Sequence, residues 1–286
     1  MTSMKRLALL ALALLAALHP RSASADTTLG YLIGSLPYNA SHPGVYYFNK
    51  DLVYTGTYGA AIAITASDVT IDMNGFELAD ERGAAITTNG FVSNNCNRIT
   101  IENGTILGFF EGVNLTSQDA SVTNLLVTSS YRIGITVAGD NASITGNRVN
   151  FTGGSTNSAG IFAIGIVLSG SYGNVSNNQV EKTYTADAST HYAAGIDVRD
   201  CSNVVVSNNR VLDVEPTAPA KATSTGIEAD SAAPSDNLIF LGNVVTSAEV
   251  GFDLSGGASG SYGDNTTSSV ATGYYGSGLT NIGNNN

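Results

Sequence analysis

Three acidic residues occupy the same place in three similar segments of the chain. Asp197, Glu228 and Asp253 each follow a Gly and one apolar residue and precede another apolar residue, as in Gly-Ile-Asp-Val. Side chains alternate between the two faces of a strand, so the apolar residues point inward and the acids outward. If the segments stack as parallel strands, the acids form a column at about 4.8 Å spacing. Like charges that close repel unless a cation or ligand intervenes, so the column is a candidate site.

Two kinds of chemistry suit this column. Two carboxylates on neighbouring strands can serve as the acid and as the base or nucleophile of glycoside hydrolysis. The three acids, Asp197, Glu228 and Asp253, can instead be ligands of Ca²⁺, which prefers oxygen donors and could hold a uronate. In that polysaccharide lyase, Arg199 would be the base or the charge-neutralising group. The alternative is a solvated acidic face that Arg199 partly neutralises and that has no catalytic role.

Long insertions precede the Gly-led strands at residues 150–163, 181–194 and 213–225. Such loops on a rigid scaffold often carry function, although surface insertions are also tolerated without one. On this interpretation they wall a groove over the acidic column. They add His191 as a further catalytic candidate. The candidate substrate-binding residues are Asp230, Lys182, Tyr184, Tyr192 and Lys221.

Internal repeats predict the elements that position these residues. Seven segments contain a short apolar strand followed by an Asn or Gly bend, and a Gly-led strand comes next, with a period of about 20 to 35 residues. One such unit cannot close a core, whereas stacked coils can. Asn and Gly tolerate the left-handed bend, and Asn can form ladders along the stack. The pattern predicts an all-β fold, a single-stranded right-handed parallel β-helix (solenoid) of about seven coils. A β-sandwich would instead show hairpin turns every 8–12 residues or so.

The N-terminus has the pattern of a cleaved signal peptide. Lys5 and Arg6 precede an apolar run of Leu and Ala, and small residues lead up to a cleavage site near Ala25. We therefore expect export, to the periplasm or the extracellular space; the alternative is a retained membrane anchor. The expected organisation is a signal peptide at 1–25, an N-terminal cap at 26–58, the β-helix at 59–255, and a degenerate last coil with a flexible tail at 256–286.

Composition limits the partners. The chain has 12 Lys and Arg against 23 Asp and Glu, a net charge of −11, so we expect no nucleic acid partner. After the signal peptide no apolar run is long enough to span a membrane, and a monomer is expected.

The two cysteines belong to the same position of different coils. Cys96 lies five residues before Ile101, and Cys201 lies five residues before Val206. Four coil steps separate them, which is roughly 19 Å, whereas a disulfide needs Cα atoms within about 7 Å. We therefore predict two free, buried thiols despite the oxidising compartment.

The chain resembles the pectin-lyase-like group of right-handed β-helix proteins over roughly residues 44–255. The opening coil, with Gly44-Val-Tyr-Tyr-Phe and Asp68-Val-Thr-Ile-Asp-Met-Asn-Gly, is similar to exported bacterial β-helix repeat proteins, and the Asn-rich coils are similar to NosD-type repeats. The enzyme motifs of polygalacturonases, alginate epimerases and pectate lyases are absent.

The resemblance implies an exported protein that binds a polysaccharide along the outer face of its Gly-led sheet, and it leaves open whether the chain also processes that polysaccharide. One alternative is a polysaccharide lyase or glycoside hydrolase that uses the acidic cluster with or without Ca²⁺. The other is a non-catalytic structural or envelope β-helix.

Overall fold

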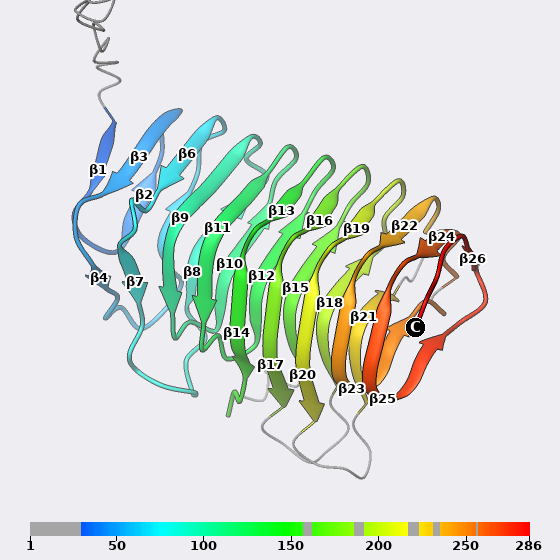
Figure 1. The fold of residues 1–286 in the computed structure, drawn as a ribbon. Helices are drawn as coiled ribbons and strands as arrows, with labels where there is room; N and C mark the ends of the chain where they lie inside the picture. Colours follow the sequence, from blue (N-terminus) through cyan, green and yellow to red (C-terminus); the bar gives the residue numbers. More distant parts are fainter. Residues whose placement is uncertain (1–29, 157–161, 186–191, 217–222, 231–234, 256) are drawn as a thin grey trace, which may run out of the picture.

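The computed structural model describes residues 30–156, 162–185, 192–216, 223–230, 235–255 and 257–286. Within these ranges every helix or strand assigned is a β-strand, and all the strand pairings are parallel (Figure 1). The strands stack in successive coils, so the predicted right-handed parallel β-helix is confirmed. The predicted signal peptide lies outside the described residues. No helix in the described ranges is long and apolar enough to cross a membrane.

The Gly-led sheet carries the acidic column. Its strands pair in the order β2 (Tyr38–Ala40), β5 (Ala60–Ile64), β8 (Asn89–Asn94), β10 (Glu111–Thr116), β12 (Ile133–Ala138), β15 (Ala163–Ser169), β18 (Ala193–Arg199), β21 (Ser224–Asp230), and the second halves of β23 (Val244–Asp253) and β25 (Thr266–Tyr275).

Two further ladders complete each coil. The second comprises β1 (Tyr31–Ile33), β3 (Gly44–Phe48), β6 (Val69–Asp72), β9 (Ile99–Leu107), β11 (Ser121–Thr128), β13 (Ser143–Thr145), β16 (Asn174–Ser176), β19 (Val205–Ser207), β22 (Leu238–Leu241), β24 (Gly260–Gly263) and β26 (Leu279–Asn281). The third comprises β4 (Leu52–Val53), β7 (Glu77–Ala79), the second halves of β9 and β11, β14 (Arg148–Gly153), β17 (Gln179–Thr185), β20 (Arg210–Pro216), and the first halves of β23 and β25.

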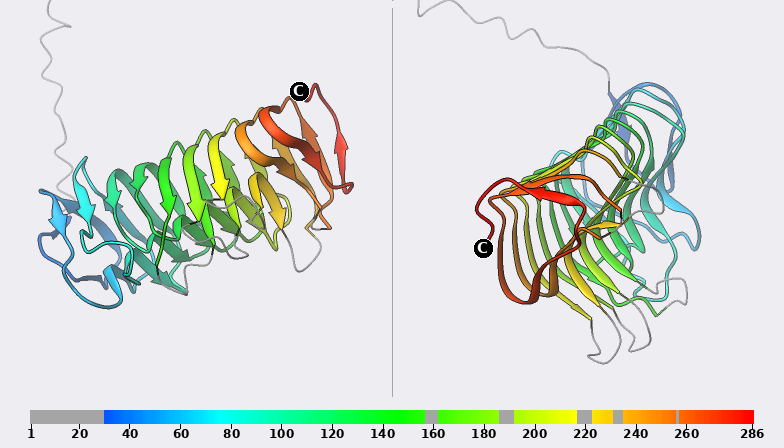
Figure 2. Two further views of the ribbon diagram at one scale, coloured as in Figure 1. Left: turned by 90° about the horizontal axis from the view of Figure 1, so that it is seen from below. Right: turned by 90° about the vertical axis from the view of Figure 1, so that its right-hand side faces the viewer.

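The stack is longer than the repeat count suggested, and Figure 2 shows it from the side as an elongated body. About seven coils were expected between residues 59 and 255. In that interval eight strands of the Gly-led ladder are present, from β5 to β23, and β2 and β25 add one at each end. The segments expected to be the cap and the tail thus also contain strands that extend the coils.

An asparagine ladder joins the coils at the bend that follows the second sheet. The side chains of Asn147, Asn178, Asn209, Asn243 and Asn265 are buried. The Oδ1 of each accepts a hydrogen bond from the backbone N–H of its counterpart one coil earlier, at 2.9–3.0 Å from Asn147 to Asn265. The residue before each ladder Asn has a positive φ, as the predicted left-handed bend requires. The ladder thus satisfies buried backbone donors where the sheet hydrogen bonds are interrupted.

Both cysteines are free and buried, as predicted. The strand register relates the residues three positions before them, Ser93 and Val198, through four successive pairings. The register behind the acidic column therefore agrees with the cysteine positions.

The insertions begin later than the repeat pattern predicted. The first residues of 150–163, 181–194 and 213–225 belong to β14, β17 and β20 and continue the third ladder. In contrast, β23 and β25 pass from the third ladder to the Gly-led ladder as single long strands without an intervening loop. The last two coils, β23 and β25, therefore have no insertion between these two ladders.

Candidate functional site

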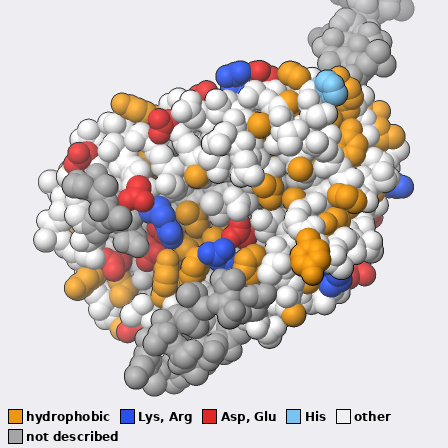
Figure 3. Space-filling model, turned by 180° about the vertical axis from the view of Figure 1, so that it is seen from behind, with side chains coloured by type: hydrophobic (Ala, Val, Ile, Leu, Met, Phe, Trp, Pro, Cys, Tyr) orange, Lys and Arg blue, Asp and Glu red, His pale blue; other side chains and the backbone are white. Residues whose placement is uncertain are grey.

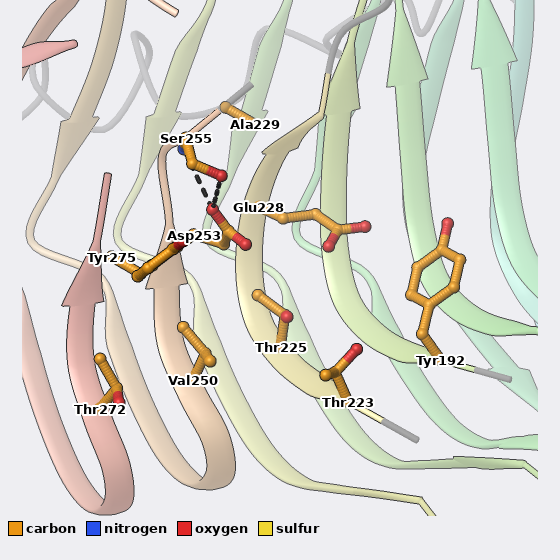
Figure 4. Close-up of a pocket in the computed structure, with 10 residues that line it drawn as sticks. All are labelled: Tyr192, Thr223, Thr225, Glu228, Ala229, Val250, Asp253, Ser255, Thr272 and Tyr275. Atoms are coloured by element: carbon orange, nitrogen blue, oxygen red, sulfur yellow. Dashed lines mark hydrogen bonds between the residues drawn. The ribbon is translucent and has the colours of Figure 1, made fainter. Parts of the chain in front are cut away.

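The outer face of the Gly-led sheet has a groove of about 620 Å³ at its C-terminal end. Its lining residues come from β21, β23 and β25 and from the segments beside them (Figure 4): Tyr192, Thr223, Thr225, Glu228, Ala229, Val250, Asp253, Ser255, Thr272 and Tyr275. On this side of the molecule, acidic and basic side chains gather among hydrophobic ones (Figure 3). Two of the residues predicted from sequence, Glu228 and Asp253, therefore line this groove.

The strand register confirms the predicted column. Asp197 pairs with Glu228, and Glu228 pairs with Asp253. The same column continues to Tyr275, which pairs with Asp253. Tyr275 was not among the predicted site residues, because residues 256–286 were expected to form only a degenerate last coil and a flexible tail. The available signal was Gly273-Tyr274-Tyr275, in which Tyr275 holds the same place after Gly as Asp197, Glu228 and Asp253.

Asp197 differs from expectation because its side chain is completely buried, with 0 % exposure. It forms an ion pair with Arg199 of the same strand, whose side chain is 30 % exposed. Arg199 also donates a hydrogen bond from Nη2 to the Tyr192 hydroxyl at 3.4 Å. The prediction that Asp197 would be exposed in the groove is therefore wrong, and neither Asp197 nor Arg199 lines it.

An apolar cluster on the outer face explains this burial. Ile133, Ile164, Val167 and Ala194 form a second core outside the solenoid, and Phe162 and Tyr192 pack against it. The two aromatic rings stack with their centroids 5.8 Å apart. Outward-pointing side chains in this part of the sheet are thus covered by aromatic residues from the adjoining segments, which strand alternation alone does not predict.

A second ion pair supports the cluster from the N-terminal side. Arg132 contacts Glu111 at 3.0 Å, and its guanidinium carbon lies 4.4 Å from the Phe162 ring centroid. Burial raises the pKa of Glu111, while Arg132 and a hydrogen bond from Asn114 oppose this effect. A continuous series of contacts therefore runs from Glu111 through Arg132 and Phe162 to Tyr192, which walls the groove.

Glu228 and Asp253 occupy different environments within the groove. Glu228 is 8 % exposed, against the prediction of an exposed side chain, whereas Asp253 is partly exposed. The Asp253 Oδ1 accepts hydrogen bonds from the backbone N–H of Ser255 at 3.0 Å and from its hydroxyl at 2.6 Å. In Figure 4, Glu228 extends toward Tyr192, and Tyr275 lies on the opposite side. Two carboxylates of unequal exposure thus lie between two tyrosines.

A Ca²⁺ site across the three acids does not fit this arrangement. Asp197 is paired with a cation and does not line the groove. Among the described residues, no group of three His, Cys, Asp or Glu side chains is placed to hold a metal ion. The remaining two carboxylates do not supply the six to eight oxygen ligands or so that Ca²⁺ takes.

The other predicted residues divide into four groups. Tyr192 lines the groove, as expected. Lys182 and Tyr184 instead line a separate cavity on the third sheet and share it with Phe151, Asp213 and Glu215. They were expected in loops near the acids, but they belong to β17. The Asp230 backbone pairs with Arg199, and nothing further is described of its side chain. His191 and Lys221 lie outside the described residues.

The chain belongs to the family described as the right handed beta helix region, whose model matches residues 89–268. Comparison with curated protein sequences finds no match.

Solved structures of similar fold include two phage tailspike proteins and an alginate lyase. The Dettilon tailspike protein is 12% identical, with 87% of this chain and 51% of that chain covered and a TM-score of 0.58. The tailspike protein of E. coli bacteriophage HK620, solved with a pentasaccharide, is 14% identical, with 89% and 54% covered and a TM-score of 0.54. An alginate lyase from Paenibacillus is 13% identical, with 85% and 99% covered and a TM-score of 0.51. The chain spans about half the length of the two tailspike chains, and the likeness is one of fold.

Proposed function

We propose that this protein binds a polysaccharide in the groove of the Gly-led sheet. The observation that carries the proposal is the position of Glu228 and Asp253 on neighbouring strands between Tyr192 and Tyr275. Tyrosine combines a flat apolar ring with a polar tip, so both walls can pack against sugar rings. Carboxylate and threonine oxygens on the floor can accept hydrogen bonds from sugar hydroxyls.

The shape of the groove supports a chain-like ligand. Its floor repeats from coil to coil, since Thr225, Val250 and Thr272 form one column and Glu228, Asp253 and Tyr275 form the next. A repeating surface suits a repeating ligand. The volume lies within the roughly 300–1,000 Å³ of ordinary ligand sites. Two proteins of this fold support the choice of ligand. The HK620 tailspike was solved in complex with a pentasaccharide, and the Paenibacillus protein is an alginate lyase.

Glycoside hydrolysis is the second candidate, and the unequal exposure of the two carboxylates favours it. Glycosidases use one carboxyl group as an acid and another as a base or nucleophile, in different environments. Here Glu228 is nearly buried, whereas Asp253 is more open and is hydrogen-bonded by Ser255. The lyase version has less support, because Arg199 is engaged with Asp197. The predicted leader at 1–25 would bring the protein to the periplasm or the extracellular space, where polysaccharides occur.

Binding can be tested by affinity electrophoresis of the purified protein in gels that contain neutral or acidic polysaccharides. We expect at least one polysaccharide to retard the wild type, and Tyr275→Ala to reduce the retardation at least tenfold in apparent affinity. Tyr172→Ala is the matched control, since this tyrosine is 64 % exposed and outside the groove. Equal retardation of Tyr275→Ala and wild type, or no retardation by any polysaccharide, would contradict the proposal.

Catalysis is tested by measuring new reducing ends in the same polysaccharides. If the pair is catalytic, Glu228→Gln and Asp253→Asn remove product formation but keep the retardation. Retained product formation in both variants would reject hydrolysis by this pair.

A further inference from the structure

A second cavity, of about 400 Å³, lies on the third sheet. It is lined by Phe151 of β14, Lys182 and Tyr184 of β17, and Asp213 and Glu215 of β20. None of these residues lines the groove of the Gly-led sheet. The cavity is therefore a separate feature of the surface.

The strand register arranges these side chains as a small array over three coils. Residues 151, 182 and 213 occupy one column, since their neighbours Asn150, Glu181 and Leu212 are paired. Two positions further along, Gly153 pairs with Tyr184, and Tyr184 pairs with Glu215. The sixth position of this array is thus a glycine, and the ring of Tyr184 lies close to the next residue, Gly154. A side chain at Gly153 would collide with the Tyr184 backbone, so only glycine fits beside Tyr184 here.

The backbone conformation of the first column makes its residue types unusual. Phe151, Lys182 and Asp213 have φ of 54°, 53° and 52°. The same place in other coils is taken by Ser129, Ser247 and Ser269, which also have positive φ. From Gly108 onward each coil has a left-handed residue here, and a bulky Phe or a Lys is an uncommon choice for that conformation. Residues in such sparsely populated backbone conformations cluster at active sites and ligand-binding sites.

The side chains in the cavity offer a sugar an aromatic surface for packing and polar groups for hydrogen bonds. The Phe151 ring is 43 % exposed, and the Lys182 Nζ lies 4.7 Å from its centroid. Among the ion pairs of the described residues, none joins Lys182 to Asp213 or Glu215. An aromatic face, one ammonium donor and two carboxylate acceptors thus line one hollow.

We propose that this cavity is a second saccharide-binding site and that it takes a neutral sugar. The apolar face of the sugar ring packs on Phe151 and Tyr184, its hydroxyls donate to Asp213 and Glu215, and Lys182 donates to a hydroxyl oxygen. Two acids against one cation disfavour a uronate, because like charges repel. The class of ligand rests on the proposed function, but the location does not depend on the groove.

The test must separate the two sites. Val250→Arg places a long side chain in the groove and leaves the cavity untouched. In this background, calorimetric titration uses cello-, malto-, xylo- and galacto-oligosaccharides as neutral probes and oligogalacturonate as the acidic probe. Phe151→Ser introduces the residue found in neighbouring coils, so it should fold at least as stably. Tyr172→Ser is the matched control, since this exposed tyrosine also has a positive φ.

We expect Val250→Arg to keep binding at least one neutral oligosaccharide. Adding Phe151→Ser should weaken this binding at least tenfold, whereas adding Tyr172→Ser should not change it. Equal affinity with and without Phe151→Ser, preference for oligogalacturonate, or no binding of a neutral probe in the Val250→Arg background would overturn the inference. If Val250→Arg by itself abolishes binding, the result supports the groove alone. If Val250→Arg leaves binding unchanged and only Phe151→Ser removes it, the result supports the second site and counts against the groove.

Discussion

Removal of Arg199 is the most informative perturbation of the outer face. Its partner Asp197 has a fully buried carboxylate, and Arg199 supplies the one ion pair found for it among the described residues. Removing one member of a buried pair typically costs about 3–5 kcal/mol of folding free energy, because the other charge is left uncompensated. Since the Arg199 side chain is 30 % exposed, we predict a loss near the lower end, about 3 kcal/mol, for Arg199→Ala.

The preceding coil provides the matched control. At the paired positions it has Val167 in place of Asp197 and Ser169 in place of Arg199. The double variant Asp197→Val with Arg199→Ser copies that solution, and replacement of buried ion pairs by apolar residues is often neutral or stabilising. We predict that the double variant is at least as stable as wild type.

The assay is urea unfolding followed by circular dichroism at pH 7, with the midpoint and slope compared among the three proteins. A loss below about 1 kcal/mol for Arg199→Ala would refute the view that the pair is a buried structural contact, because that is the range of surface salt bridges. A double variant less stable than Arg199→Ala would refute it as well. Polysaccharide retardation of the double variant should remain, because neither residue lines the groove.

Further predictions concern the core. Asn209→Ala leaves two donors of Asn178 without their buried acceptor, so we expect a loss of about 2–6 kcal/mol in urea unfolding, against under about 0.5 kcal/mol for the exposed control Asn94→Ala. Burial alone would raise the pKa of Asp80, but hydrogen bonds from Arg82 and Thr88 have the larger combined effect. The pKa of Asp80 is therefore lowered from its ordinary value. Asp80 therefore stabilises the fold above its unfolded pKa, and this contribution is lost as pH falls through the folded pKa; from about pH 5 to 2 the wild type should lose more stability than Asp80→Asn, and equal losses would contradict this. Burial raises the pKa of the Cys201 thiol to about 11, so alkylation at pH 8 should require denaturant and then modify both cysteines; a disulfide would contradict the register.

The coil register could be predicted from sequence because it follows from short-range chemistry. The Gly-led strands, the left-handed bends and the Asn ladder each depend on a few residue types at fixed spacing. These placed Asp197, Glu228 and Asp253 in one column, as the strand pairings show. The same register separated the two cysteines correctly.

Burial on the outer face could not be predicted in the same way. Strand alternation says that Asp197 points outward, but it does not say what covers the sheet. Phe162 and Tyr192 pack on each other and on residues of adjacent coils that are far apart in the sequence. Lys182 and Tyr184 were misplaced for a similar reason, since the segment that contains them belongs to β17 and continues the third ladder.

Hydrogen exchange with and without a bound polysaccharide fragment tests the central claim most directly, because it locates the ligand without any substitution. Mass-spectrometric exchange is measured on the wild type with the oligosaccharide of whichever polysaccharide retards it most. We predict slower exchange in peptides that cover Thr223–Tyr275, with Tyr192 protected as well. Protection confined to the second sheet, or no protection at saturating oligosaccharide, would contradict binding in the groove of Glu228 and Asp253.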